Sequence, residues 1–313
     1  MTYRGGPRPQ LPAPTRASGK RDAARRGRGT DAGHAAARIA YPLVAGKDYR
    51  AESMFRPEHL LREARRQRQL PEADVPAVAL LDPDGDIVRF LRRTGRGRKH
   101  PGWACYHTEM WVTDLGGLEI GVVGCAVGAS FAVLVAEQLA ASGAQIVVSI
   151  TSAGQIRAPD ALPCFVLIER ALRDEGTSAH YMPPGKWSHL DPPVARRLCE
   201  TLHDFTPKVF AGASWTTDAP YRETEAAIQG AVGEGIACVE MEAAALYAYA
   251  AARGRLVVCL AHITNTMATG GDDFEKGAND GAGSSLSVAY AVAAALGFHP
   301  PRGDRLLPPD DPK

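Results

Sequence analysis

Residues 118–150 read LEIGVVGCAVGASFAVLVAEQLAASGAQIVVSI, and they carry the clearest evidence for the fold class. The apolar runs 118–124 and 145–150 have the length and composition of buried strands. Between them, residues 129–141 have helical periodicity and end just before Gly143, a residue suited to the turn after a helix. Strand, helix and strand in about 30 residues predict a βαβ unit with parallel pairing and a right-handed crossover.

The same alternation continues toward the C-terminus. Apolar runs at 164–168 and 256–263 predict further strands, whereas the basic, glycine-rich segment 95–102 predicts a flexible loop. Helical patterns cover residues 55–68, 192–203, 221–232, 241–252 and 284–296. We therefore predict one α/β domain over residues 39–299, with a mostly parallel sheet between helices.

Two tails flank this predicted domain. Residues 1–38 are basic and rich in Pro and Gly, and residues 300–313 are rich in Pro. Neither segment has enough apolar side chains to offset the chain entropy that folding costs. We expect a disordered basic tail at the N-terminus and a Pro-rich tail at the C-terminus.

The charge is balanced overall but not along the chain. The 313 residues contain 36 Lys and Arg and 35 Asp and Glu, a net charge of +1. The first 30 residues hold eight of those bases and one acid, so they carry +7 and the remainder carries −6. A basic arm can contact nucleic acid, but the acidic remainder argues against nucleic acid as the main partner.

Several protein classes are excluded at this stage. No apolar run reaches the roughly 18–20 residues of a membrane span, and the basic start has no apolar core of a secretory signal. The six cysteines form no closely spaced pair, so we expect reduced thiols in a cytoplasmic protein and no metal site.

Small residues follow two of the predicted strands. Gly124 and Gly128 flank a strand–helix turn, where the backbone and the helix N-terminus can receive an anion. Ser152, Ala153 and Gly154 follow the next strand, where open α/β sheets bind ligands. Ordinary Gly and Ser turns would leave the same pattern, so both interpretations stay open.

Two acids stand in apolar surroundings. Glu240 and Glu242 flank Met241 just before an alanine run. Each acid in the first turn of a helix stabilises that helix by roughly 0.3–1 kcal/mol. This effect explains the presence of one exposed acid better than the presence of two acids in an apolar stretch. A partly buried carboxylate needs hydrogen-bond donors, and vicinal sugar hydroxyls can supply them. Asn265 follows the strand 256–263, where it can read a heterocycle edge or simply form a turn.

Three stretches together resemble the nucleoside phosphorylase-I family. They are VEMEAAALY at 239–247, SWTTDAPY at 214–221 and DEGTSAHY at 174–181, within a resemblance that covers about residues 75–298. The resemblance implies a three-layer α/β/α fold with a mixed, mostly parallel sheet. It also implies cleavage of a nucleoside N-glycosidic bond, no metal, no organic cofactor, and a homo-oligomer built as a dimer-based hexamer or a trimer.

The resemblance also implies roles for individual residues. Glu242 and Asn265 would be catalytic, Asn265 by hydrogen bonds to the leaving base. The ribose would contact Glu240, Met241 and Glu242; the base would contact Ala153, Gly154, Tyr221 and Asn265; phosphate would contact Gly124 and Ser152.

Departures from the family pattern leave the reaction open. The acidic turn 82–86 replaces the family's Gly-Asp-Pro-x-Arg loop, Ser149 stands at an arginine position, and Pro220 stands at a base-stacking Phe position. The main expectation is a phosphorylase that uses inorganic phosphate as co-substrate and yields free base and (deoxy)ribose 1-phosphate. The alternatives are a nucleoside or nucleotide N-glycosidase that uses water, and a non-catalytic nucleoside-binding protein. The base, purine or pyrimidine, is also open.

Overall fold

The computed structural model describes residues 43–157, 162–263, 276 and 278–300. The two predicted tails lie outside these residues, apart from Pro300, and so does Asn265. The helices are α1 Pro57–Arg68, α2 Asp86–Thr94, α3 Ala129–Ala141, α4 Pro192–Thr201, α5 Glu225–Gly233, α6 Ala243–Arg253 and α7 Ala282–Ala295. None of the helices in this described part is long and apolar enough to cross a membrane.

One mixed sheet runs through the domain. Its strands are β1 Val78–Asp82, β2 Arg98–Lys99, β3 Met110–Leu115, β4 Leu118–Gly124, β5 Ile146–Ser152, β6 Gly154–Gln155, β7 Cys164–Asp174, β8 Trp187–His189, β9 Val209–Thr217, β10 Ile236–Glu240 and β11 Leu256–Ile263. Their order is β2-β3-β4-β1-β5-β11-β7-β9-β10-β6, with β8 paired to β7.

The predicted βαβ unit is confirmed, with one strand inserted into it. β4 and α3 have the predicted bounds, and β5 follows one residue later than expected. β1 lies between β4 and β5 and pairs parallel with both, Val78 facing Ile120 on one side and Ile146 on the other. All five residues of β1 are buried, as expected of a strand covered on both faces.

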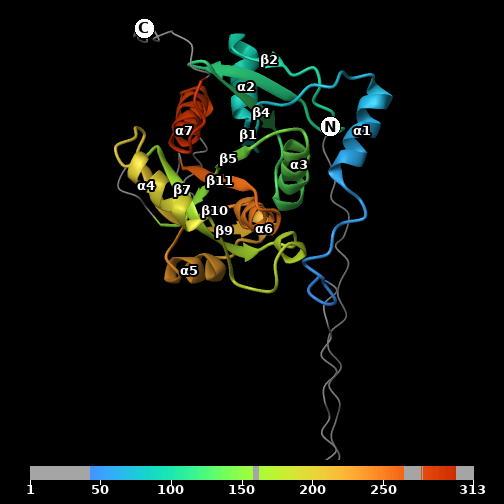
Figure 1. The fold of residues 1–313 in the computed structure, drawn as a ribbon. Coiled ribbons are helices and arrows are strands. Elements are labelled where there is room, and N and C mark those ends of the chain that lie inside the picture. Colours follow the sequence, from blue (N-terminus) through green and yellow to red (C-terminus); the bar gives the residue numbers. More distant parts are fainter. Residues whose placement is uncertain (1–42, 158–161, 264–275, 277, 301–313) are drawn as a thin grey trace, which may run out of the picture. The chain divides into compact units, whose positions relative to one another are not determined.

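Helices cover both faces of the sheet. α3 packs against α6 and carries α1 on its outer side, while α2 and α4 pack against α7. In Figure 1, α7 and α3 lie on opposite sides of the central strands. The main core consists of Val, Leu, Ile and Ala side chains from the central strands and from α3, α6 and α7. The three-layer α/β/α prediction is therefore confirmed.

Some elements differ from the prediction. Segment 95–102 contains the short strand β2, because its backbone pairs antiparallel with β3, Arg98 facing Val112 and Lys99 facing Trp111. The predicted helix 221–232 begins later, at α5, because the Thr224 side chain caps it by accepting from the Ala227 N–H. β7 runs well beyond residue 168, since its far half pairs with β8 and β9.

The sheet direction places the chemistry-bearing segments. β4, β1, β5 and β11 all run parallel, so their carboxyl ends meet at one edge. The residues that follow those ends include the turn 83–85, the glycine segment 125–128 and Ala153. Ligand crevices of open α/β sheets form outside such an edge.

Candidate active site

Glu240, the last residue of β10, has its carboxylate fully engaged by the chain. Its oxygens accept from Ser214 Oγ at 3.0 Å, from Thr216 Oγ1 at 2.5 Å, and from the N–H groups of Glu242 and Ala243, both at 2.7 Å. Burial raises the pKa of Glu240, and these four donors oppose that shift. Glu240 therefore supports the backbone turn that leads into α6. Its predicted contact with ribose stays a prediction.

Glu242 is the residue that this turn presents. It caps α6, and its Oε1 accepts from the Gly128 N–H at 2.7 Å. Gly128 begins α3 with a φ of 87°, a left-handed value that glycine adopts without strain. Burial, together with the charge of Glu240, raises the pKa of Glu242 to about 8. The hydrogen bond joins the glycine turn after β4 to the turn after β10, although the two are 114 residues apart.

A cavity of about 180 Å³, which we call the carboxylate cavity, lies beside these two acids. The residues lining it include Asp84, Ser152, Gly154, Pro220, Glu223 and the segment Glu240 to Glu242. Of the residues predicted from the sequence, Ser152, Gly154, Glu240, Met241 and Glu242 therefore come together on its wall.

The other predicted residues lie elsewhere. Ala153 is buried beside the cavity wall, and the side chain of Tyr221 is 99% exposed outside it. Gly124 ends β4 against α2, where a Cβ atom would lie 3.0 Å from Val88 Cγ2, so close helix–strand packing explains this glycine. Asn265 is outside the described residues. The ligand contacts predicted for these four residues stay predictions.

Asp84 is a further residue of the candidate site, and in the sequence only the acidic turn pointed to it. It follows β1, lines the carboxylate cavity, and accepts from the Ser152 N–H at 2.7 Å through Oδ2. Nearby Asp82 faces inward, where its Oδ2 accepts from the Val88 N–H at 2.9 Å at the start of α2. Burial raises the pKa of Asp82 to about 7. Asp82 thus supports the turn, and Asp84 faces the cavity.

Lys276 supplies a positive charge beside this turn. Its Nζ lies 2.6 Å from Asp86 Oδ2 and 3.4 Å from Asp84 Oδ1. Burial opposes the charge on Lys276, but the two aspartates outweigh it and raise its pKa. His262, stacked on Phe165 with ring centroids 4.5 Å apart, is neutral at physiological pH, because burial and the Lys276 charge lower its pKa to about 4.

Glu223 is a second site residue without a recognised sequence signal. It follows the Pro220 turn and lines the carboxylate cavity. Burial raises its pKa, and no donor from the described residues reaches its carboxylate. A half-buried carboxylate of this kind is suited to accept hydrogen bonds from a ligand.

Cys125 lies in the glycine turn after β4. It has a φ of 64°, in the left-handed region. This conformation is energetically unfavourable for a residue that carries a side chain. A Cβ atom on Gly85 would lie 2.7 Å from its Sγ, so the thiol occupies the space that this glycine leaves. Cys125 is the exposed cysteine of the six; Cys199 is partly buried and the other four are buried.

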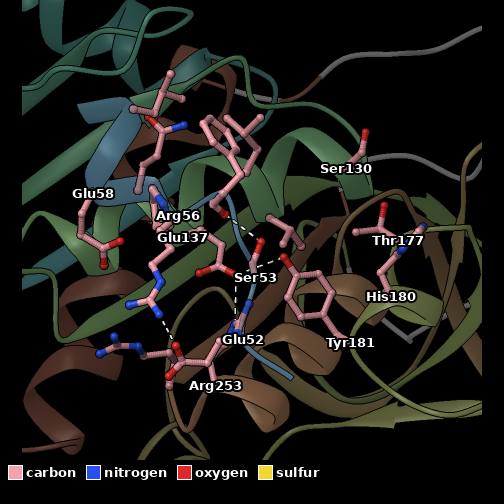
Figure 2. A pocket seen from close by; sticks show the side chains of 17 residues that line it. Glu52, Ser53, Arg56, Glu58, Ser130, Glu137, Thr177, His180, Tyr181 and Arg253 are labelled. Atoms are coloured by element: carbon pink, nitrogen blue, oxygen red, sulfur yellow. Dashed lines mark hydrogen bonds and ion pairs between the residues drawn. The ribbon is translucent and has the colours of Figure 1, made fainter. Parts of the chain in front are cut away.

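A second cavity, of about 610 Å³, lies between the segment before α1 and the helix α3 (Figure 2). Several of its charged groups pair with one another. Glu137 accepts from Tyr181 Oη at 3.1 Å and from Arg253 Nε at 3.3 Å, and Glu52 pairs with Arg56. The carboxylate cavity, by contrast, is lined by Glu223, whose carboxylate receives no donor from the described residues. We therefore take the carboxylate cavity as the candidate active site.

Comparison with known proteins agrees with this geometry. Residues 78–295 match the family model of the phosphorylase superfamily. The chain therefore belongs to the phosphorylase superfamily. No curated relative matches the chain.

Solved structures with the same fold come from enzymes of different reaction classes. Uridine phosphorylase from Vibrio fischeri ES114 is 19% identical with a TM-score of 0.57, over 72% of this chain and 93% of that one. Purine nucleoside phosphorylase from Toxoplasma gondii in complex with immucillin-H is 16% identical with a TM-score of 0.60, over 72% and 92%. AMP nucleosidase from Bacteroides thetaiotaomicron VPI-5482 is 17% identical with a TM-score of 0.60, over 77% and 97%. At these identities the likeness establishes the fold.

Proposed function

We propose that this protein is a nucleoside or nucleotide N-glycosidase that uses water as the nucleophile. The observation that carries the proposal is the hydrogen bond from the Ser152 N–H to Asp84 Oδ2, at 2.7 Å. Ser152 is one of the two residues predicted to bind phosphate, with Gly124, and its backbone donor is instead taken by a carboxylate. The Gly128 N–H is likewise taken by Glu242.

The charge of the cavity supports water over phosphate. Four acids line it, Asp84, Glu223, Glu240 and Glu242, and no Lys or Arg is among its described lining residues. Asp84 accepts from the backbone of Ser152, a residue that the sequence predicts to contact phosphate. Burial raises the pKa of Glu223, Glu240 and Glu242 and so favours their neutral forms. The repulsion of an anionic phosphate therefore comes chiefly from Asp84, whereas a neutral water molecule is not repelled.

The same residues suit hydrolysis chemically. Glu242 would accept hydrogen bonds from the ribose hydroxyls, and the surrounding acids would stabilise positive charge that develops on the sugar. Asp84 would take a proton from the attacking water as its oxygen bonds to the anomeric carbon. The bond from that carbon to the base nitrogen breaks, and the base leaves with the electron pair and takes up a proton from solvent water, while Asp84 returns its proton to solvent. Asn265 would stabilise the departing base by hydrogen bonds, as the sequence predicts.

The test is release of base from inosine, adenosine, guanosine, uridine, thymidine and AMP, with and without inorganic phosphate. We expect the same rate in both buffers and free pentose as the sugar product. Asp84→Asn should lower kcat by about 10²–10⁴-fold, the range of general-base catalysis. Asp114→Asn is the matched control, because Asp114 is exposed on β3.

Two results would overturn this proposal. Base release that requires phosphate and yields pentose 1-phosphate would make the protein a phosphorylase. Binding of nucleosides without release of any base would make it a binding protein.

A further inference from the structure

Lys276 is the feature that the proposed reaction does not yet use. Its ammonium group lies between the carboxylates of Asp84 and Asp86, and its side chain is only 25% exposed. A second cation, Arg89, pairs with Asp86 and donates to the Asp84 carbonyl oxygen at 3.0 Å. Within the part of the chain that the structure describes, Asp86 thus has two cationic partners and the Asp84 side chain has one.

The contacts of Asp84 explain why a cation is needed there. Oδ2 is held by the Ser152 N–H at 2.7 Å, and Oδ1 faces Lys276 Nζ at 3.4 Å. One donor comes from the end of β5 and the other from residue 276, so the carboxylate is oriented from two separate parts of the chain. The Nζ–Oδ1 distance is longer than a strong hydrogen bond, which leaves Oδ1 able to accept from another donor.

We propose that Lys276 is a positioning residue, which holds the Asp84 carboxylate oriented to accept a proton from the attacking water. The inference rests on the proposed hydrolytic function. In the step itself, the water proton passes to Asp84, the water oxygen bonds to the anomeric carbon, and Lys276 keeps its own protons. Lys276 does not touch the reacting atoms.

The charges around Asp84 make the role of Lys276 specific. Among the described residues, the titratable and charged groups near Asp84 are Asp82, Asp86, Arg89, Glu242, His262 and Lys276, and Glu223 and Glu240 line the same cavity. Five of these eight are acids and His262 is neutral, so Arg89 and Lys276 are the cations of this set. Arg89 contacts the Asp84 backbone and not its carboxylate.

The first test is the pH dependence of base release by Lys276→Met, Lys276→Arg and Lys186→Met. Lys186 is the matched control, since it pairs with Glu234 on the surface at 2.5 Å. We expect Lys276→Met to lower kcat about tenfold or more and to move the acid side of the rate profile up by about 1–3 pH units. KM should change little, Lys276→Arg should restore most of the rate, and Lys186→Met should match the unaltered protein.

The second test does not depend on activity. Lys276 helps to lower the pKa of His262, so Lys276→Met should raise the pKa of that ring in an NMR titration, with the signal assigned from His262→Gln. An unchanged His262 titration would overturn the proposed position of the Lys276 charge. The unaltered protein could release no base while the pKa of His262 still rises in Lys276→Met. In that case the proposed function would be wrong, and the proposed position of the Lys276 charge would be supported.

Two further results would overturn the inference. A fall in kcat without a shift of the acid side of the pH–rate profile would mean that Lys276 only supports the fold. A phosphate-dependent reaction whose KM for phosphate rises in Lys276→Met would make Lys276 a phosphate ligand.

Discussion

Glu240 and Glu242 are two residues apart and chemically identical, but their different surroundings give them different roles. Glu240 receives four hydrogen bonds from the chain, so its charge is already stabilised. Glu242 receives a 2.7 Å bond from Gly128 and a longer 3.3 Å contact from the Met241 N–H, and it lines the carboxylate cavity. The number of donors from the chain distinguishes Glu240, which supports the turn, from Glu242, which we propose binds a sugar.

At the same scale, Glu223→Gln should change which base the protein prefers. A carboxylate only accepts hydrogen bonds, so Glu223 should favour a base edge that offers N–H groups, such as those of guanine or hypoxanthine. Loss of a hydrogen bond to a charged group costs about 1.5–3 kcal/mol, or roughly 10- to 100-fold. The measurement is the ratio of kcat/KM for inosine to that for adenosine. Glu225→Gln is the control, because Glu225 is exposed and lies two residues later. Equal ratios in the two variants would contradict a contact between Glu223 and the base.

The elements themselves could largely be predicted from the sequence. Apolar runs and helical periodicity located β4, α3 and β11 at their observed bounds, because burial on both faces leaves a strong pattern. α2 was not predicted, and its first residue, Asp86, is the last residue of the predicted turn 82–86. β10 is only five residues long and was not predicted at all.

The candidate site could be predicted only in part, for a physical reason. The motif around Glu242 is local in sequence, so it could be recognised. The contacts of Asp84 with Ser152 and Lys276 span 68 and 192 residues along the chain, and no local pattern reveals them. Glu223 stands in an ordinary polar segment, and only its place on the cavity wall marks it.

Among the elements, α6 is tied to the sheet by Tyr247. Its hydroxyl donates to the Ile168 carbonyl at 2.5 Å and accepts from the Cys259 N–H at 3.1 Å. Ile168 precedes an irregularity in the β7–β9 register, so the tyrosine satisfies a backbone group at a break in the ladder.

We expect Tyr247→Phe to lower the free energy of unfolding by about 1–3 kcal/mol, the cost of leaving buried polar groups unpaired. Urea denaturation measures it. Tyr290→Phe, on a half-buried residue of α7, should be nearly neutral. A similar loss of stability in the two variants would show that the hydroxyl of Tyr247 has no special role.

At the scale of the whole molecule, the protein should be a homo-oligomer, as the family resemblance implies. Large apolar side chains stand exposed around both cavities, among them Val127 at 51%, Leu134 at 39% and Phe55 at 67%. Exposed apolar side chains of this kind mark surfaces that bind other proteins.

Light scattering after size-exclusion chromatography should give a mass at least twice the 33.3 kDa of one chain. Leu134→Glu, on the outer side of α3, should reduce that mass if α3 lies in the interface. An active protein with the mass of one chain would contradict the prediction.

The left-handed turn that exposes Cys125 also makes the protein convenient to label. Four of the six thiols are buried and Cys199 is partly so, which leaves one readily accessible sulfur, two residues before Val127 on the cavity wall. A maleimide dye would therefore attach near the entrance without any engineering of the chain. Its fluorescence would report the arrival of a ligand in real time, before any bond is broken.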